Sequence, residues 1–386
     1  MLYTKLACPL FIGMTAVSLA AAAIAATPPV ARVTDTADTL HGVVVKDPYR
    51  YFENVKSPEV QTWLKAQGEV ARETLDKIAV RQRIEARITE LTDASGDAIR
   101  EIVRMPGERV YYLKREKGAR QYKLVMRVGV TGAERVLVDP EADAKRTGIP
   151  HALNYFEPSW DGRYVAYGMS AGGSEDASLY VLDVKTGKNV GKPIPRVYGD
   201  VVNWLPDSRS LTYNQTRKLA PGDADSETFL DTSVMWLKVG EPEANAKPIF
   251  GPTVTKSLGL ARLDVATVFF SPESPWMVAR TTDTTLPEGF LFVAPVAQLG
   301  KPTIQWQKIS GYSDNITDAQ LRGNELYMMT RLNTPRHKVI KLDLRNPDLK
   351  RAVDVAVAPT DAVLERFQLT RDGVIGCDEA APYEVE

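Results

Sequence analysis

The run Gly168-Met169-Ser170-Ala171-Gly172 fits the pattern G-x-S-x-G, in which serine hydrolases carry their nucleophile. The pattern works when the serine lies on a tight turn between a strand and a helix, because that turn exposes Oγ and aligns backbone N–H groups as an oxyanion hole. An apolar, strand-like run precedes Ser170, but a polar Gly-rich stretch and a second strand-like run at 179–182 follow it. Since no helix is indicated there, the sequence favours a turn between two strands over a nucleophile elbow.

A nucleophilic serine also needs a base within hydrogen-bond reach, usually histidine. The sequence has His41, His151 and His337, and each falls in an irregular stretch or beside a turn, where a surface or turn role is commoner. The acidic pairs Glu175-Asp176 and Asp223/Asp225 are interpreted as solvated loop charge. Zinc-ligand, Walker A and dinucleotide-binding patterns do not occur in the sequence. We therefore expect no catalytic, cofactor-binding or metal-binding residue in this chain.

A polar turn followed by an aromatic or aliphatic run recurs along most of the sequence. The repeats lie roughly 45–65 residues apart, which is the period of a blade of four short strands. They predict a ring of small sheets, each of which buries both faces against its neighbours. Residues 185–188 predict a hairpin, and 218–228 a long exposed loop within a blade. The turns and the runs they precede are 105–108 before 110–113, 161–162 before 164–167, 206–208 before 211–213, 271–273 before 276–278, 323–325 before 326–328, and 371–373 before 374–375.

The first residues form a separate feature. Lys5 supplies one positive charge before an uncharged, mostly apolar run at 6–25, which ends in the small residues Ala23-Ile24-Ala25. This pattern is typical of a secretory signal peptide, so residues 1–25 are predicted to be removed near Ala25. An uncleaved membrane anchor is the alternative, because the run is just long enough to span a bilayer. Cleavage predicts a periplasmic or secreted protein that is not held at a membrane.

Composition narrows the function classes further. The 386 residues include 48 Lys and Arg against 49 Asp and Glu, and the two signs are interspersed. This balance argues against a nucleic-acid partner, which would require a basic patch. After signal cleavage Cys377 would be the one remaining cysteine, so no internal disulfide is expected.

Residues 26–95 predict a small helical segment and 96–386 a β-repeat region. Ser57-Pro58-Glu59 is typical of a helix start, because a serine side chain can cap free N–H groups and proline suits the first helical position. Apolar residues with helical spacing follow at 60–78 and again at 84–91. The sequence therefore predicts a mainly β fold that is preceded by short helices.

Several segments resemble the prolyl oligopeptidase family of serine peptidases. Residues 47–54 look like the family's D-P-Y-x-W-x-E segment, and residues 57–64 resemble the helix that follows it there. Residues 157–175 are similar to the family blade sequence P-S-P-D-G-R-Y-x-A-Y-x-x-S-x-G-G-S-E, and residues 330–336 to the blade segment T-x-x-x-A-P-R. The likeness runs over about residues 30–350, and its motifs are long and in the family's order.

This resemblance implies a seven-bladed β-propeller inserted into an α/β-hydrolase domain that cleaves short peptides after proline. Residues 26–95 would belong to the hydrolase domain and 96–386 to the propeller. In the family, the catalytic Ser, Asp and His lie in a C-terminal segment that has no counterpart here, and the position of Ser170 is a propeller residue. We therefore expect an N-terminal, truncated part that is inactive alone, with its propeller gating short proline-containing peptides for a catalytic part on a separate chain.

The same interpretation predicts an unfinished propeller. The stretch 376–383 no longer looks like a blade, so the ring is expected to be incomplete and to leave open strand edges. Trp63, Leu64 and the rest of their helical stripe would lie exposed or pack poorly without a hydrolase core. A stand-alone secreted propeller that binds a peptide or protein without catalysis is the alternative hypothesis. A third and weaker hypothesis is that Ser170 is a nucleophile.

Overall fold

The computed structural model describes residues 29–199, 202–283, 285–370, 373–377 and 382–385. The chain divides into two compact units, Met1–Ser95 and Gly96–Glu386. The predicted signal peptide at residues 1–25 lies outside the described residues. Where the chain is described, no helix is both long enough and apolar enough to cross a bilayer.

The first unit contains a β-hairpin, a 3₁₀ turn and two helices. The Ser57 hydroxyl makes no capping hydrogen bond, so the start of the first helix rests on Pro58, whose fixed φ suits the first helical position. The elements are β1 (Ala37–Leu40), β2 (Val43–Lys46), η1 (Arg50–Glu53), α1 (Pro58–Asp76) and α2 (Arg81–Ala94).

Most of the apolar stripe on the two helices is exposed. Leu64 is 45% exposed, and Ile88 is 58% exposed. Trp63 differs, because its ring meets Phe52 edge-on at 4.6 Å and its Nε1 donates a hydrogen bond to the Pro29 carbonyl at 3.1 Å. The expectation of an exposed stripe is confirmed for these aliphatic residues and is wrong for Trp63, which packs within its own unit.

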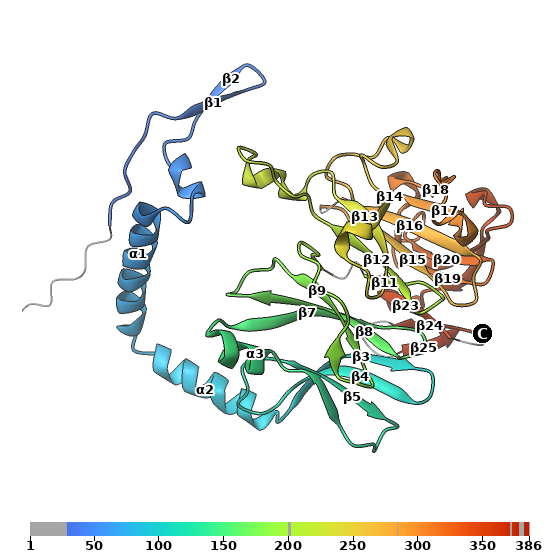
Figure 1. Ribbon diagram of the computed structural model, residues 1–386, viewed down its shortest axis with the longest axis horizontal. Coiled ribbons are helices and arrows are strands. Elements are labelled where there is room, and N and C mark those ends of the chain that lie inside the picture. Colours follow the sequence, from blue (N-terminus) through green and yellow to red (C-terminus); the bar gives the residue numbers. More distant parts are fainter. Residues whose placement is uncertain (1–28, 200–201, 284, 371–372, 378–381, 386) are drawn as a thin grey trace, which may run out of the picture. The chain divides into compact units, whose positions relative to one another are not determined.

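The second unit consists of successive antiparallel sheets, which follow one another from cyan through green and yellow to red in Figure 1. In each sheet the strands are paired in chain order. The sheets of the described residues are β3 (Ala98–Met105), β4 (Arg109–Arg115), β5 (Lys123–Val128) and β6 (Arg135–Val138); β7 (His151–Pro158), β8 (Tyr164–Ala171), β9 (Ser178–Asp183) and β10 (Lys188–Asn189); β11 (Asn203–Trp204), β12 (Ser210–Gln215), β13 (Ser233–Lys238) and β14 (Lys247–Phe250); β15 (Val265–Phe270), β16 (Trp276–Thr282), β17 (Leu291–Pro295) and β18 (Gln307–Ser310); β19 (Ile316–Arg322), β20 (Glu325–Thr330), β21 (Lys338–Asp343) and β22 (Val353–Val357); and β23 (Arg366–Leu369), β24 (Val374–Cys377) and β25 (Pro382–Val385).

The predicted turns from 105–108 to 323–325 fall where the blade repeat requires them, between the first and second strands of their sheets. The turn predicted at 371–373 lies mostly outside the described residues. The hairpin predicted at 185–188 joins β9 to β10, and the loop at 218–228 lies between β12 and β13 and contains η2 (Asp225–Phe229). The expectation that 376–383 departs from the blade pattern is wrong. Gly376 pairs with Tyr383 and Cys377 with Pro382 in the last sheet, which has three described strands.

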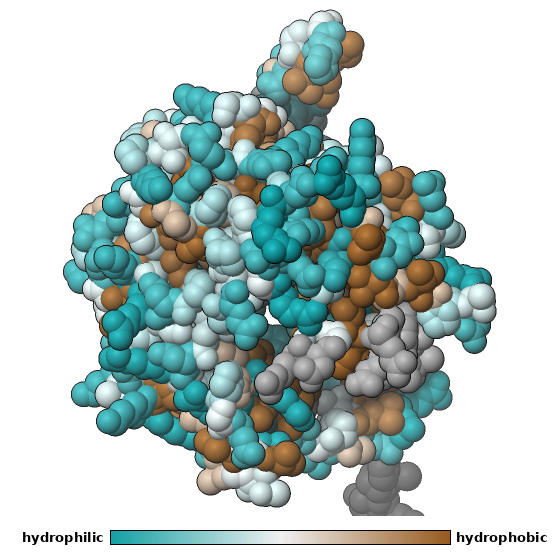
Figure 2. Space-filling model, turned by 90° about the vertical axis from the view of Figure 1, so that its right-hand side faces the viewer, coloured by the Kyte–Doolittle hydropathy of each residue, from teal (hydrophilic) through white to brown (hydrophobic). Residues whose placement is uncertain are grey.

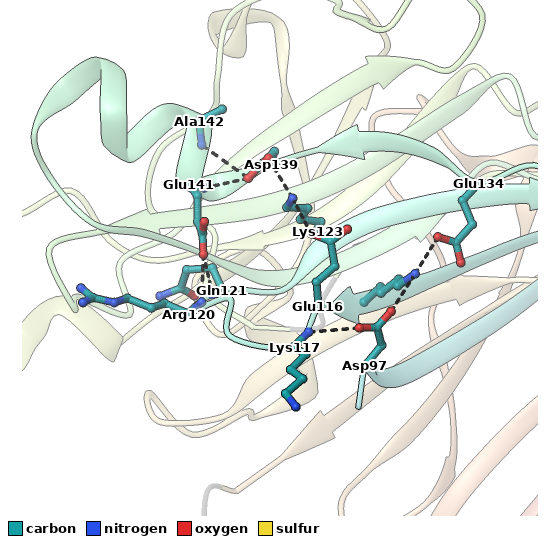
Figure 3. Close-up of polar contacts among 11 residues, drawn as sticks. Asp97, Glu116, Lys117, Arg120, Gln121, Lys123, Glu134, Asp139, Glu141 and Ala142 are labelled. Atoms are coloured by element: carbon teal, nitrogen blue, oxygen red, sulfur yellow. Dashed lines mark hydrogen bonds and ion pairs between the residues drawn. The ribbon is translucent and has the colours of Figure 1, made fainter. Parts of the chain in front are cut away.

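One helix in the second unit is not predicted by the repeat pattern. Helix α3 (Pro140–Thr147) follows β6, and Asp139 caps it by accepting hydrogen bonds from Glu141 N at 3.0 Å and Ala142 N at 3.4 Å (Figure 3). Gly148 ends the helix with a φ of 74°. The sequence has strong capping signals for this helix. The repeat pattern does not predict it, because the helix is short and lies between two segments with a strong strand pattern. The remaining 3₁₀ turns are η3 (Glu243–Asn245), η4 (Lys256–Leu258), η5 (Val296–Gln298), η6 (Tyr312–Asp314) and η7 (Leu349–Arg351).

Charged side chains fasten the start of the first sheet (Figure 3). Lys114 Nζ lies 3.1 Å from Asp97 Oδ2 and 2.8 Å from Glu134 Oε2, and Asp97 Oδ1 accepts a hydrogen bond from Lys117 N at 3.0 Å. The hydrogen bond from Lys114 also lowers the pKa of Glu134. Because Asp97 directly precedes β3, these contacts fix the point at which the chain enters the second unit.

Buried side chains join each sheet to the next. Tyr111 and Leu124 of the first sheet pack with Val165 and Leu182 of the second, and comparable clusters link the later sheets in order. Burying one such side chain contributes about 1.5–3 kcal/mol. Within the described residues, no cluster joins the last sheet to the first, and Ile102 on β3 is 61% exposed. The mainly β propeller class is thus confirmed, with successive sheets packed and the ring not closed by a shared core.

Gly168 offers a test of this packing. It lies on β8, and a Cβ at this position would come within 2.2 Å of the Tyr155 ring on β7. We expect Gly168→Ala to lower the free energy of unfolding by about 1–3 kcal/mol, the usual cost of overpacking. Urea denaturation followed by fluorescence measures this difference.

The matched control is Gly68→Ala in α1, where a Cβ meets nothing within 4 Å. Alanine is the better helix former, so this change should be neutral or stabilising. Equal stability of Gly168→Ala and the unmodified chain would contradict the packing described here.

Candidate functional site

Ser170 lies inside a sheet. It is on β8, is 5% exposed and pairs with Ala152 of β7. A turn and then β9 follow, as the sequence predicts, so the serine is not placed between a strand and a helix. The nucleophile-elbow geometry is therefore not formed at this position.

The neighbouring histidine does not face the serine. His151 pairs with Ala171, one position along from the Ser170–Ala152 pair, and adjacent residues of a strand point to opposite faces of the sheet. Nδ1 of His151 lies 2.8 Å from the Ile149 carbonyl, and Nδ1 of His337 lies 2.7 Å from the Leu364 carbonyl. His41 occupies the turn between β1 and β2 with a φ of 51°. His41 thus lies in a turn, and His151 and His337 contact backbone carbonyls through Nδ1.

No group of three or more His, Cys, Asp or Glu side chains that could hold a metal ion is found among the described residues. Cys377 is a free thiol on β24, paired in the sheet with Arg366 and Pro382. The expectation that this chain has no catalytic, cofactor-binding or metal-binding residue stays a prediction from the sequence.

The first strands of the first three sheets of the second unit line a common cavity. A space of about 420 Å³ is lined by residues of β3, β7 and the segment that enters β11, among them Glu101, Tyr155, Glu157 and Asn203. In a propeller the innermost strands surround a central channel. Figure 2 shows a hollow near the middle of the face in view, as expected of the mouth of such a channel. This axial cavity is the candidate functional site.

Polar side chains tie the innermost strands together. Asn203 Nδ2 donates to Thr267 Oγ1 at 2.9 Å, which links β11 to β15. Gln320 links β19 to β23 twice, because Nε2 donates to the Phe367 carbonyl at 2.6 Å and Oε1 accepts from Leu369 N at 2.9 Å. These contacts tie the first strands of neighbouring sheets to one another, and Asn203 is the one of these residues that also lines the axial cavity.

A partly buried arginine and a partly buried aspartate lie on β16 and β19. Arg280 Nη2 on β16 donates to the Thr317 carbonyl at 2.7 Å, and burial lowers the pKa of this guanidinium. Burial raises the pKa of the Asp318 carboxyl on β19, while the hydrogen bond from Ala319 N and the charge of Arg280 oppose that rise. Desolvation therefore outweighs the attractive contacts of Asp318.

An ion network fastens the long loop between β12 and β13. Glu227 Oε2 on η2 accepts from Arg217 Nη1 at 2.8 Å and from Arg262 Nη2 at 2.9 Å. Arg217 also binds Asp223, and Arg262 also binds Asp231. Isolated surface ion pairs contribute little, but several charges that share partners hold a loop more firmly. The loop that the sequence predicts as exposed is thus tethered at its middle and at both ends.

The comparisons with known proteins agree with this architecture. Residues 28–378 match the family described as "Prolyl oligopeptidase, N-terminal beta-propeller domain". A prolyl endopeptidase of Elizabethkingia meningoseptica is 22% identical over 331 residues, which cover 85% of this chain and 44% of that protein. Prolyl oligopeptidase A of Galerina marginata is 25% identical over 378 residues, which cover 89% of this chain and 49% of that protein. The chain spans about half the length of the curated relatives it matches.

Solved structures show the same fold. One comes from a structural and mechanistic study of two prolyl endopeptidases, with a TM-score of 0.75 at 24% identity over 91% of this chain and 50% of that chain. Prolyl oligopeptidase B from Galerina marginata, bound to a 35mer hydrolysis and macrocyclization substrate, has a TM-score of 0.73 at 18% identity over 91% of this chain and 51% of that chain.

The repeated sheets, their mutual packing and these matches define a β-propeller of the kind found in peptidases. The chain belongs to the prolyl oligopeptidase family, of which it carries the N-terminal propeller domain.

Sequence reasoning did not identify the residues that join the first strands of neighbouring sheets. Asn203 and Gln320 act through contacts with the next sheet, 64 and 47 residues away for their respective partners Thr267 and Phe367. Strand periodicity does not show such contacts. Arg217 and Glu227 are only ten residues apart, but charged residues at such spacing are common in solvated loops. Their partner Arg262 lies in a different loop, between β14 and β15. No local signal marks any of these residues.

Asp318 gives a pH-dependent test. Its folded-state pKa is raised, so the stability cost of its negative charge is absent below the unfolded-state pKa and fully present above the folded-state pKa. We expect Asp318→Asn to match the unmodified chain near pH 3 and to exceed it in unfolding free energy at pH 7. Thermal melts across this pH range measure the difference.

Asp343 is the control of opposite sign, because hydrogen bonds from Arg345 lower its pKa to about 2. Asp343→Asn should lose stability at pH 7, and that loss should vanish as the pH falls through about 2. A stability difference for Asp318→Asn that does not change with pH would contradict the burial argument.

Glu227 tests the loop network. Glu227→Gln removes the negative charge that both Arg217 and Arg262 bind, so the loop at 216–232 should be cleaved several-fold faster in limited proteolysis while the melting temperature changes little. Glu273→Gln, an exposed residue in a turn of the fourth sheet, is the control. Equal cleavage rates in the two variants would show that the network does not hold the loop.

Proposed function

We propose that this chain is the substrate-gating propeller of an exported serine peptidase that cleaves short peptides after proline. The observation that carries the proposal is the match of residues 28–378 to the family's propeller domain, together with first strands that converge on one cavity. The cavity of about 420 Å³ is large enough for an extended peptide segment and far too small for a folded protein. Size selection then follows from the walls of the propeller alone.

The chemistry of cleavage is assigned to a catalytic part outside these residues. Serine-peptidase chemistry needs a nucleophile, a base that takes its proton and an acid that orients the base. Ser170 and His151 face opposite sides of their sheet, so we do not assign either residue to that chemistry. The role of this chain is to bind the catalytic part, admit peptides and exclude larger proteins.

The location is also a proposal. The apolar run at 6–25 and the small residues that end it support export to the periplasm or the medium. N-terminal sequencing of the secreted or periplasmic protein should find residue 26 first.

Enzyme assays of the 386-residue chain test whether it cleaves peptides by itself. We expect neither turnover of a fluorogenic Gly-Pro peptide nor covalent labelling by an active-site fluorophosphonate, because no activated serine is proposed here. Ser170→Ala should behave like the unmodified chain in both assays. Labelling that Ser170→Ala abolishes would overturn the proposal.

The stand-alone binding propeller makes a different prediction. Such a protein should elute as one species from a sizing column and melt in a single cooperative transition. A gating propeller that lacks its catalytic part should instead aggregate through its exposed apolar face on the first sheet, where Ile99 is 50% and Val130 is 72% exposed.

A further inference from the structure

A second cavity lies on the rim of the propeller, away from the axial cavity. It has a volume of about 630 Å³ and lies between β14, η4 and the loop that joins β17 to β18. Because β14 is the last strand in its sheet's order, this is the outer edge of the ring. Cavities of this volume are typical of small-ligand sites, which combine aromatic walls with a few polar groups. The proposed gating of peptides does not involve this rim cavity.

Positive charge gathers in the rim cavity without a compensating acid. Lys247 on β14, Lys256 on η4 and Lys301 in the β17–β18 loop all line it, and the described lining contains no aspartate or glutamate. None of the three lysines forms a salt bridge with a described residue, and Lys247 Nζ lies 5.7 Å from the centroid of the Trp236 ring. The whole chain has a formal net charge of −1, so the local excess is not a property of the composition. Three like charges around one cavity repel one another, and a bound anion would offset that repulsion.

Two indole rings supply the aromatic walls of the rim cavity. Trp306 is held in place because its ring meets Phe250 edge-on at 5.1 Å and its Nε1 donates to the Ile249 carbonyl at 3.3 Å. Trp236 Nε1 is buried and has no acceptor among the described residues. Gly300 packs on Trp236: its φ is +83°, and a Cβ there would lie 3.4 Å from Cζ3 of the ring.

A purely structural role accounts for part of this arrangement. A lysine and a proline on an edge strand discourage pairing with another chain, and Lys247 and Pro248 on β14 serve that purpose. The same argument does not extend to Lys256 and Lys301, which lie in loops. It also does not explain two tryptophans beside the lysines.

We propose that the rim cavity binds a small ring-bearing polyanion, a ligand with two or more carboxylate or phosphate groups on a ring-shaped body. Lysine ammonium groups attract anionic oxygens as point charges and can adapt to their spacing. Indole surfaces bind the flat or apolar face of a ring. Acidic oligosaccharides and nucleotides share this chemistry and differ in the source of their charge.

Titration of the full chain with trigalacturonate and with ATP distinguishes these two sources. Tryptophan fluorescence and calorimetry report on binding, because two of the chain's six tryptophans line the rim cavity. We expect at least one of these ligands to bind saturably, and at least tenfold more tightly than its neutral counterpart, maltotriose or adenosine. It should also bind at least tenfold more tightly than the ringless anion tripolyphosphate. Added salt should weaken its binding.

Variants locate the site. The double variant Lys256→Gln/Lys301→Gln should lose at least tenfold in affinity, and Lys247→Gln should lose affinity as an independent single change. Lys185→Gln/Lys188→Gln, in the β9–β10 hairpin of another sheet, should bind like the unmodified chain. The proposal is overturned if neither ligand saturates, if tripolyphosphate binds as tightly as both, or if the rim-cavity variants bind normally. None of these outcomes depends on peptidase activity.

Discussion

In the second unit, the apolar faces of successive sheets are covered by neighbouring sheets, while Ile99 and Ile102 of the first sheet stay exposed. Tyr111, Val165 and Leu182 are buried where the first two sheets meet, and the same contact recurs from sheet to sheet. Packing in series places the first strand of each sheet on the inside and the last on the rim. Both cavities follow from this order, because the axial cavity forms between first strands and the rim cavity beside a last strand.

Polar contacts then convert a stack of sheets into defined walls. Asn203 and Gln320 bind the neighbouring sheet and fix the spacing of the innermost strands. At the rim, Gly300 allows a loop to lie against Trp236. A hydrophobic core alone would tolerate small shifts between sheets. The cavities need the polar contacts, since their dimensions depend on how far apart the sheets are held.

The sequence predicts most of the fold because the blade repeat is local. A polar turn at 161–162 and the strand that follows are visible in one short run of residues, and the same holds for the hairpin at 185–188. The sequence also favours a turn between two strands over a nucleophile elbow at Ser170, and in the structure β9 follows β8. The sequence does not predict the cavities. Lys256 and Lys301 are separated by the three strands β15, β16 and β17, so only the folded chain brings them together. The stretch 376–383 was hard to predict because its residues do not repeat the earlier blade sequences, although Gly376 and Cys377 pair with the next strand.

Hydrogen exchange tests most directly whether sheet-to-sheet packing holds this molecule together. The second strands β8, β12, β16 and β20 are largely buried, whereas α2 has no buried residue among those described. We expect the amides of these strands to exchange slowest and together, and those of α2 to exchange orders of magnitude faster. Slow exchange in α2 combined with fast, independent exchange in the second strands would contradict the account.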